Sequence, residues 1–189
     1  MIVKYVFYFM IFSLLFTLFA FTQATTYKFI LFLEIIITGV SSYMYYLFTK
    51  KDLHSIALLR YNGWVITTPI MLVVLSLLSN IQSVPILITI VVLDLIMLLF
   101  GYLGETKQIN RSTASLGFIP LLSIFYLLYD NSLIFGIYVL IWTGYGIAYY
   151  FDEKLKNIFM SVFDAIAKGV VAILISMYSL NYKSLLSAM

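Results

Sequence analysis

Seven long apolar segments, separated by short polar breaks, dominate this sequence. Each segment is close to the roughly 20 residues that an α-helix needs to cross the hydrocarbon core of a bilayer. The segments lie near residues 5–22, 28–48, 57–79, 84–104, 112–129, 132–150 and 157–179. Because the breaks are short, consecutive helices must be antiparallel neighbours in one bundle. The pattern predicts an all-α membrane protein with a single seven-helix domain over residues 1–189.

The composition supports a membrane protein and excludes several classes of function. Hydrophobic residues make up 63% of the chain and charged residues 10%, which is far from the composition of soluble domains. The chain has no Cys and one His, His54, so disulfides, thiolate chemistry and a metal cluster lack their ligands. The net charge of +3 is spread over short loops, which argues against nucleic acid as a partner. We therefore expect the lipid bilayer as partner, and neither an enzyme nor a metalloprotein.

The first segment allows a second interpretation. Lys4 stands before an apolar run, as it would in a signal peptide. We prefer a membrane helix for this segment, because seven helices complete a bundle better than six.

The basic residues of the loops bear on orientation in the membrane. Lys and Arg in short loops normally mark the cytoplasmic side. The side that carries the N-terminus has Lys4, Lys50, Lys51, Lys107, Arg111, Lys154 and Lys156, whereas the opposite side has Lys28 and Lys183. Taken alone, this count places the N-terminus inside.

Ionisable residues are costly inside the hydrocarbon core, so those found there are candidates for function. The apolar segments contain five of them: Glu34, Arg60, Asp94, Asp164 and Lys168. Three acids and two bases leave a formal sum of −1 if all of them ionise, which favours pairing over isolated burial.

Asp164 and Lys168 lie four residues apart in the last segment, VFDAIAKGVV, so they project from the same helical face. A buried primary amine favours its neutral form, which is the nucleophile that condenses with an aldehyde. The protonated imine that results is a cation that requires an anion nearby, and Asp164 is placed to supply it. A plain Asp–Lys ion pair that holds a bundle together remains an alternative on this motif alone.

Two further segments carry polar and aromatic residues at helical spacing. In the third segment they recur along one stripe: Arg60, Trp64, Thr67, Thr68 and Met71. In the sixth segment they are Trp142, Tyr145 and Tyr149, with the small Gly144 and Gly146 beside them. Such rings can sandwich a flat polyene. With 18% aromatic residues in the chain, a helix core or an interfacial belt is the more frequent explanation of such stripes.

The order of these motifs resembles that of microbial (type 1) rhodopsins. The chain has RYNGWVITTP at residues 60–69, WTGY at 142–145 and DAIAK at 164–168. The match covers the second to seventh segments, but the fifth matches loosely and the first carries no diagnostic residue. The resemblance implies a seven-helix bundle that encloses all-trans retinal, bound as a Schiff base to Lys168 with Asp164 as counterion.

The resemblance also implies roles for other residues. The retinal-binding residues would be Trp64, Thr67, Thr68, Met71, Asp94, Met97, Gly101, Trp142, Tyr145 and Tyr149. The ion pathway would involve Arg60, Glu34, Tyr45 and Tyr61, with Arg60 as its gate. Thr68 would bond to Asp94, and Tyr45 would lie beside Asp164.

The chain departs from the outward proton pumps of that family at two positions of the third segment. Gly63 stands where such pumps have the primary proton acceptor, and Val74 stands where they have a donor carboxylate. Asp164 would therefore be the sole counterion, similar to schizorhodopsins, which move protons inward. Glu34 would compensate for Val74, and viral rhodopsins likewise carry a Glu in the second helix. The alternative for Glu34 is a carboxyl capped near the membrane surface, since Lys28 is six residues away.

Three functions follow in order of preference. The first is light-driven or light-gated transport of protons or small ions. The second is a sensory photoreceptor that signals to a partner protein without transport, and the third is a structural membrane protein without retinal. The family usually has its N-terminus outside, against the Lys and Arg count, although heliorhodopsins show the inverted insertion, and a homo-oligomer stays open.

Overall fold

The computed structural model describes residues 2–81 and 83–187, with side chains described up to residue 181. The first four membrane helices are α1 (Ile2–Gln23), α2 (Lys28–Phe48), α3 (Leu53–Leu78) and α4 (Val84–Glu105). The fifth consists of α5 (Arg111–Ala114), η1 (Ser115–Gly117) and α6 (Phe118–Leu127), and the sixth is α7 (Leu133–Ala148). The seventh consists of α8 (Glu153–Asp164), η2 (Ala165–Val170) and α9 (Val171–Ser187). The predicted seven-helix all-α membrane bundle is confirmed.

Polar residues in three of the breaks cap the helix that follows. Asp52 accepts a hydrogen bond from the Ser55 backbone amide at 2.7 Å, and this bond holds the pKa of the exposed Asp52 carboxyl below its usual range. Asn110 caps α5 and Ser132 caps α7 in the same way. A capping side chain satisfies an amide that the first helical turn leaves without a partner. These caps mark where α3, α5 and α7 begin.

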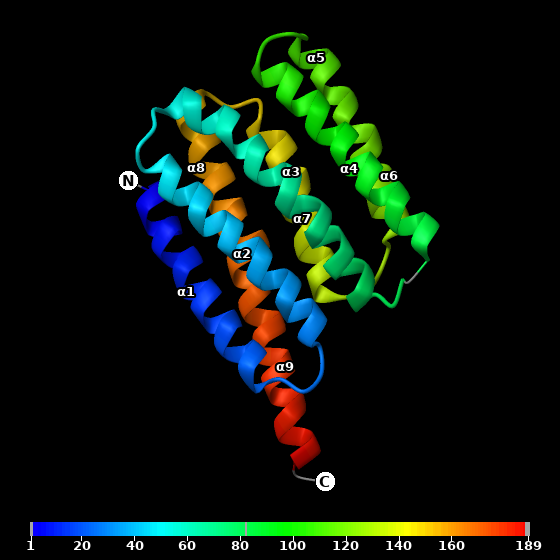
Figure 1. The fold of residues 1–189 in the computed structure, drawn as a ribbon. Helices are drawn as coiled ribbons and strands as arrows, with labels where there is room; N and C mark the ends of the chain where they lie inside the picture. Colours follow the sequence, from blue (N-terminus) through cyan, green and yellow to red (C-terminus); the bar gives the residue numbers. More distant parts are fainter. Residues whose placement is uncertain (1, 82, 188–189) are drawn as a thin grey trace.

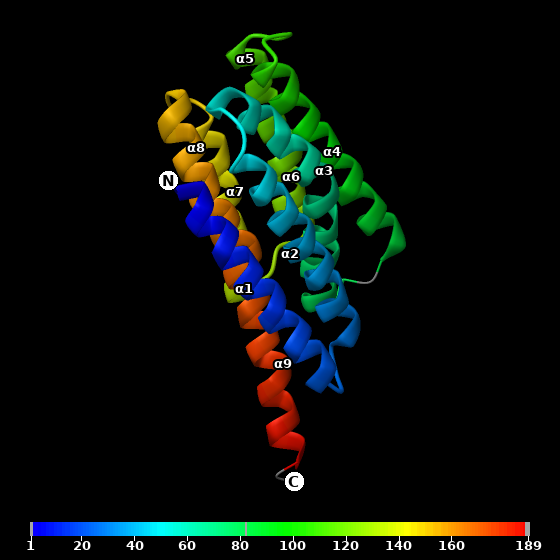
Figure 2. The same cartoon turned by 60° about the vertical axis from the view of Figure 1, so that its left-hand side comes forward.

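The seven helices lie side by side in a closed bundle (Figures 1 and 2). Each of the first four helices packs against the next in sequence, and the seventh packs against both the sixth and α1. Phe125 of the fifth helix contacts the Phe135 and Trp142 rings of the sixth. We call the end at which α2, α4 and α7 finish the Arg60 end, and the end at which they begin the Glu34 end. The N-terminus lies at the Arg60 end and the C-terminus at the Glu34 end, as an odd number of crossings requires.

The first helix is part of the bundle, in agreement with the interpretation we preferred to a signal peptide. It packs along α2 and the seventh helix. Its Met10, Ser13 and Thr17 side chains are fully buried against these neighbours. Ser176 of α9 donates a hydrogen bond to Thr17 at 3.3 Å, which ties the first helix to the last.

The seventh helix differs from its prediction in two ways. It runs on to Ser187 rather than ending near residue 179, and in both views α9 extends past its neighbours. Its centre, η2, is a turn of π-helix that contains Lys168, a feature frequent at functional sites. At the end of this turn a Cβ on Gly169 would meet the Phe9 ring of α1 at 2.5 Å. The close approach of α1 to η2 therefore requires glycine there, a constraint that comes from packing and not from helical periodicity.

Candidate functional site

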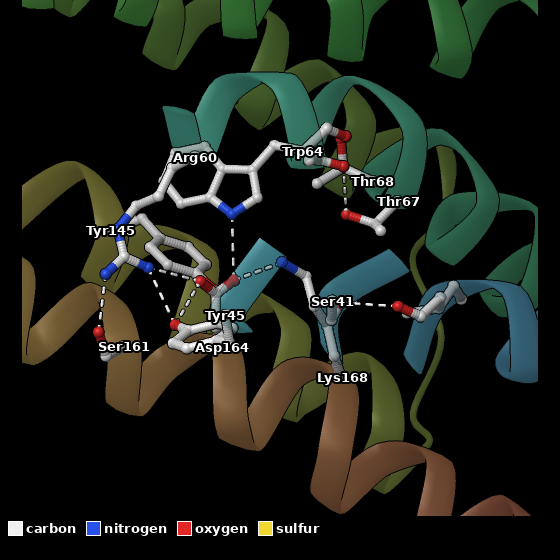
Figure 3. Close-up of polar contacts among 12 residues, drawn as sticks. Ser41, Tyr45, Arg60, Trp64, Thr67, Thr68, Tyr145, Ser161, Asp164 and Lys168 are labelled. Carbon is white, nitrogen blue, oxygen red and sulfur yellow. Dashed lines mark hydrogen bonds and ion pairs between the residues drawn. The ribbon is translucent and has the colours of Figure 1, made fainter. Parts of the chain in front are cut away.

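One buried carboxylate, that of Asp164, organises the centre of the bundle (Figure 3). It is 1% exposed and accepts hydrogen bonds from five side chains on four membrane helices. Its Oδ1 accepts hydrogen bonds from Trp64 Nε1 at 3.0 Å, from the Tyr145 hydroxyl at 2.9 Å and from Lys168 Nζ. Its Oδ2 accepts hydrogen bonds from the Tyr45 hydroxyl at 2.9 Å and from Arg60 Nη1 at 2.7 Å. A buried charge is tolerated when it is paired and fully hydrogen-bonded. The cluster therefore keeps Asp164 as a carboxylate.

Asp164 is shared between two cations. Lys168 and Arg60 both form ion pairs with it, and all three side chains are at most 5% exposed. The ionised trio carries a formal charge of +1, since two positive groups meet one negative group. The pairing predicted for the membrane charges is therefore present for this trio, and Asp94 and Glu34 lie outside it.

Arg60 reaches Asp164 directly, which the sequence did not indicate. Its Nη2 donates to Ser161 Oγ at 2.7 Å and to the Asn157 carbonyl at 3.3 Å. These bonds attach α3 to α8 at the Arg60 end of the site. A chain of hydrogen bonds thus runs from Lys168 through Asp164 to Arg60 and on to the seventh helix.

A long cavity extends from Lys168 between the third to seventh helices, lined mostly by aromatic and apolar side chains. Of the residues predicted for the retinal site, it brings together Trp64, Thr68, Met71, Met97, Gly101, Trp142, Tyr145 and Tyr149. Tyr61, which we assigned to the ion pathway, also lines this cavity. At Gly101 a Cβ would meet the Tyr61 hydroxyl at 2.8 Å, so glycine leaves room for that phenol.

Two residues of the predicted retinal site lie elsewhere. Thr67 lines a smaller adjoining cavity with Ser41 and Lys168. Asp94 is fully buried behind Thr68, whose hydroxyl donates to Asp94 Oδ2 at 2.7 Å. The predicted bond between the third and fourth helices is present. Asp94 does not line the long cavity, because the Thr68 side chain stands between them.

The sequence missed the contribution of the fifth helix to the cavity. The missed residues are Ala114, Ser115, Gly117, Phe118 and Leu121. Positions 114, 117, 118 and 121 follow one helical face, but small and apolar residues there look the same as a surface that faces lipid. The inward direction appears in the structure, for example where Phe118 lies so close to Gly146 of α7 that a Cβ there would clash with the ring.

The residues present fit retinal. The cavity is long and apolar, aromatic rings line its walls, and one end holds a buried primary amine with a carboxylate beside it. In its neutral form, such an amine can condense with an aldehyde. The aromatic walls would hold the polyene, and Asp164 would balance the positive charge at the linkage.

Glu34 lies at the other end of the molecule's polar interior. Its side chain is 1% exposed, and its Oε1 finds no hydrogen-bond partner among the described residues. Lys28 lies over the Phe21 ring, 5.9 Å from its centre. The alternative of a carboxyl capped near the membrane surface is therefore wrong, because α2 turns Glu34 into the bundle and leaves Lys28 outside it.

A second buried ion pair lies at the Arg60 end. Lys156 Nζ of α8 donates to Glu105 Oε1 of α4 at 2.5 Å, and both side chains are at most 10% exposed. We counted Lys156 among the loop cations, but its charge is already neutralised inside the protein. The exposed Lys and Arg of this end are then Lys4, Lys50, Lys51, Lys107, Arg111 and Lys154.

The comparisons with known proteins agree with this geometry. A family model described as bacteriorhodopsin-like protein matches residues 1–133. The viral rhodopsin OLPVRII is 27% identical and superposes with a TM-score of 0.87, over 94% of this chain and 97% of that one. A blue light-absorbing proteorhodopsin from Med12 is 21% identical, with a TM-score of 0.83 over 97% and 96% of the two chains. The rhodopsin of Exiguobacterium sibiricum is 22% identical, with a TM-score of 0.81 over 98% and 96%. A search of curated proteins found no match.

This chain therefore belongs to the microbial rhodopsin family. It is an integral, multi-pass membrane protein of a family whose members bind retinal and act as photoreceptors and pumps rather than as enzymes.

Proposed function

We propose that Lys168 holds all-trans retinal, that Asp164 is its only carboxylate counterion, and that light drives or gates the movement of a proton between the two ends of the bundle. The observation that carries this proposal is that two cations share the Asp164 carboxylate. When bound, retinal would absorb light and change the direction in which the N–H bond at Lys168 Nζ points.

The third helix supports a single counterion. At Gly63, next to Trp64, a Cβ would meet Met44 Cγ of α2 at 2.9 Å. Met44 thus occupies the space into which a longer side chain at position 63 would extend. The site is built around one acid, similar to the pattern of schizorhodopsins.

Asp164 is a poor acceptor for the proton that Lys168 releases. When Lys168 turns away, Arg60, Tyr45, Trp64 and Tyr145 still donate to the carboxylate and stabilise its charge. The proton then needs another acceptor, and Val74 offers none on α3.

Glu34 is our candidate for that acceptor or for a reprotonating donor. On α2 the polar residues Glu34, Thr38, Ser41 and Tyr45 follow one face, and all of them are buried. Ser41 lines the small cavity that Lys168 reaches. Seven residues of helix separate Glu34 from Ser41, which is about 10 Å along the axis. This face offers a route away from the Arg60 end.

A sensory photoreceptor is the second candidate. Ile37, Val74 and Val171 are fully buried in one apolar cluster with other residues of the Glu34 end. An apolar cluster of this kind is a barrier to ions, and it favours a receptor that changes shape and signals to a partner protein without moving ions.

The test is expression with all-trans retinal, followed by a visible spectrum and a light-induced current in a voltage-clamped cell. We expect a pigment and a current that Glu34→Gln reduces at least tenfold. A pigment without current in wild type and Glu34→Gln alike would overturn transport, and a slow photocycle with a recovered partner would establish sensing. The sign of the current also gives the direction, which the loop charges and the family precedent leave open.

A further inference from the structure

The long cavity reaches the surface of the bundle between the fifth and sixth helices. Its lining includes Ser115 of η1 and Tyr150, which lies just beyond the end of α7. Tyr150 is 47% exposed, so the cavity connects the buried Lys168 with side chains at the protein surface. Ser115 follows α5, which stands at the Arg60 end (Figure 1). We call the place where Ser115 and Tyr150 meet the side opening.

The fifth and sixth helices are joined loosely. Among the described residues, they approach each other less closely than any other two membrane helices that are consecutive in the chain. Toward the Glu34 end, the Phe125 ring of α6 lies against the Phe135 and Trp142 rings of α7. At the side opening, a hydrogen bond between the Ser115 and Tyr150 hydroxyls joins the two helices. One hydrogen bond contributes only modestly to stability, so this bond can break while the bundle stays folded.

The surface around the side opening is apolar. Leu116 and Ile119 of the fifth helix are 46% and 63% exposed, and Ile147 of α7 is 55% exposed. Exposed apolar side chains of a membrane helix face lipid. A polyene also favours lipid over water, because its surface is apolar. The side opening therefore lies where an apolar molecule dissolved in the bilayer would meet the cavity.

We propose that the side opening admits retinal from the bilayer to the long cavity, and that the hydrogen bond between Ser115 and Tyr150 controls this passage. The inference rests on the proposed attachment of retinal to Lys168, at the inner end of the same cavity. The aldehyde end must enter first, because the amine lies at that inner end. When the bond breaks, the two helices can separate at the side opening, while the rings around Phe125 still hold them together farther along.

The experiment follows entry separately from attachment. Both tryptophans of the chain, Trp64 and Trp142, line the cavity. All-trans retinol has the same polyene as retinal but forms no imine, and it quenches the fluorescence of a tryptophan that it approaches. The full-length protein in lipid vesicles is mixed with retinol, and the rate of quenching is recorded. We expect a fast, saturable loss of tryptophan fluorescence in wild type.

Tyr150→Phe tests the hydrogen bond, because it removes only the hydroxyl. We expect quenching to become about threefold faster, a factor that one lost hydrogen bond can give. Tyr126→Phe is the matched control, since Tyr126 of α6 is 84% exposed and does not line the cavity. Its rate should equal that of wild type.

Ser115→Phe tests the route itself. The added ring fills the side opening, so we expect quenching to slow at least tenfold although the hydrogen bond is lost. Ser123→Phe is the matched control, because Ser123 lies on the same membrane helix, is also partly exposed and does not line the cavity. It should not change the rate.

Rates that stay at the wild-type value in both Tyr150→Phe and Ser115→Phe would overturn this inference and leave the proposed function intact. Quenching that follows the expected pattern in a protein that stays colourless with all-trans retinal would instead overturn the attachment to Lys168. In that case the side opening would still admit a polyene, so the two failures are distinguishable.

Discussion

The buried carboxyl groups at the two ends of the polar interior differ in their partners. At the Arg60 end every oxygen of Asp164 is bonded, two cations neutralise it, and a second ion pair of Glu105 with Lys156 lies farther out. At the Glu34 end the carboxyl is buried, and its Oε1 has no partner among the described residues. The Arg60 end is not fully satisfied, since Arg60 Nε and Asn157 Oδ1 lack a partner among the described residues. Breaking a buried ion pair is nevertheless costly, whereas Glu34 has no such pair to break in the part of the chain that the structure describes. In the proposed function, the first end supplies structure and charge balance and the second end exchanges the proton.

Asp164→Asn should have the largest effect. It leaves Arg60 and Lys168 buried without their anion, and breaking a buried pair in this way costs about 3–5 kcal/mol. We expect a large drop in thermal stability and loss of most of the visible pigment, measured by absorbance during heating. Asp94→Asn is the control, because Asp94 pairs with the neutral Thr68. Equal effects of the two variants would contradict the special position of Asp164.

Lys156→Met tests the outer part of the same end. The substitution leaves Glu105 buried without its cation, and since both side chains keep slight exposure we expect a loss of about 1–3 kcal/mol. The absorption maximum should not change, because neither residue lines the long cavity. Thermal denaturation measures the first effect and a spectrum the second. An unchanged stability would show that this pair does not stabilise the Arg60 end.

Thr68→Val probes a bond between α3 and α4 inside the bundle. It removes the hydroxyl that donates to Asp94 Oδ2. The other oxygen of this carboxyl, Oδ1, already lacks a partner among the described side chains. We expect a loss of about 1–2 kcal/mol. Thr67→Val is the matched control, since the Thr67 hydroxyl bonds only the Gly63 carbonyl of its own helix. If the control costs as much, the interhelical bond contributes little.

Glu34→Gln should change stability least. No buried partner is lost, so we expect an effect within about 0.5–1 kcal/mol, of either sign. Transport should nevertheless fall sharply. Variants at the Arg60 end should therefore change mainly stability, and this variant at the Glu34 end should change mainly transport. A loss of stability as large as that of Asp164→Asn would mean that Glu34 belongs to a bonded network after all.

The sequence predicted most of what depends on spacing within one helix or on the family motifs. The seven segments, the Asp164 and Lys168 pair, the position of Tyr45 beside Asp164 and the bond of Thr68 to Asp94 are of this kind. The retinal linkage, the counterion role and the role of Glu34 stay predictions.

What could not be predicted depends on how distant segments meet. Glu105 and Lys156 are 51 residues apart, and each sits beside a polar loop, so both resemble solvated loop charges. The glycine at position 169, within the π-helical turn, is required by the close approach of Phe9 from the first helix. The inward face of the fifth helix consists of small and apolar residues, which carry no sign of what they face.

The central claim is tested most directly by mapping where retinal is attached. The purified protein is supplied with all-trans retinal, the linkage is reduced with borohydride, and the labelled peptide is identified by mass spectrometry. The account predicts a coloured protein with the label on Lys168, and a colourless Lys168→Ala variant that still folds. A colourless wild type, or a label on any other lysine, would contradict it.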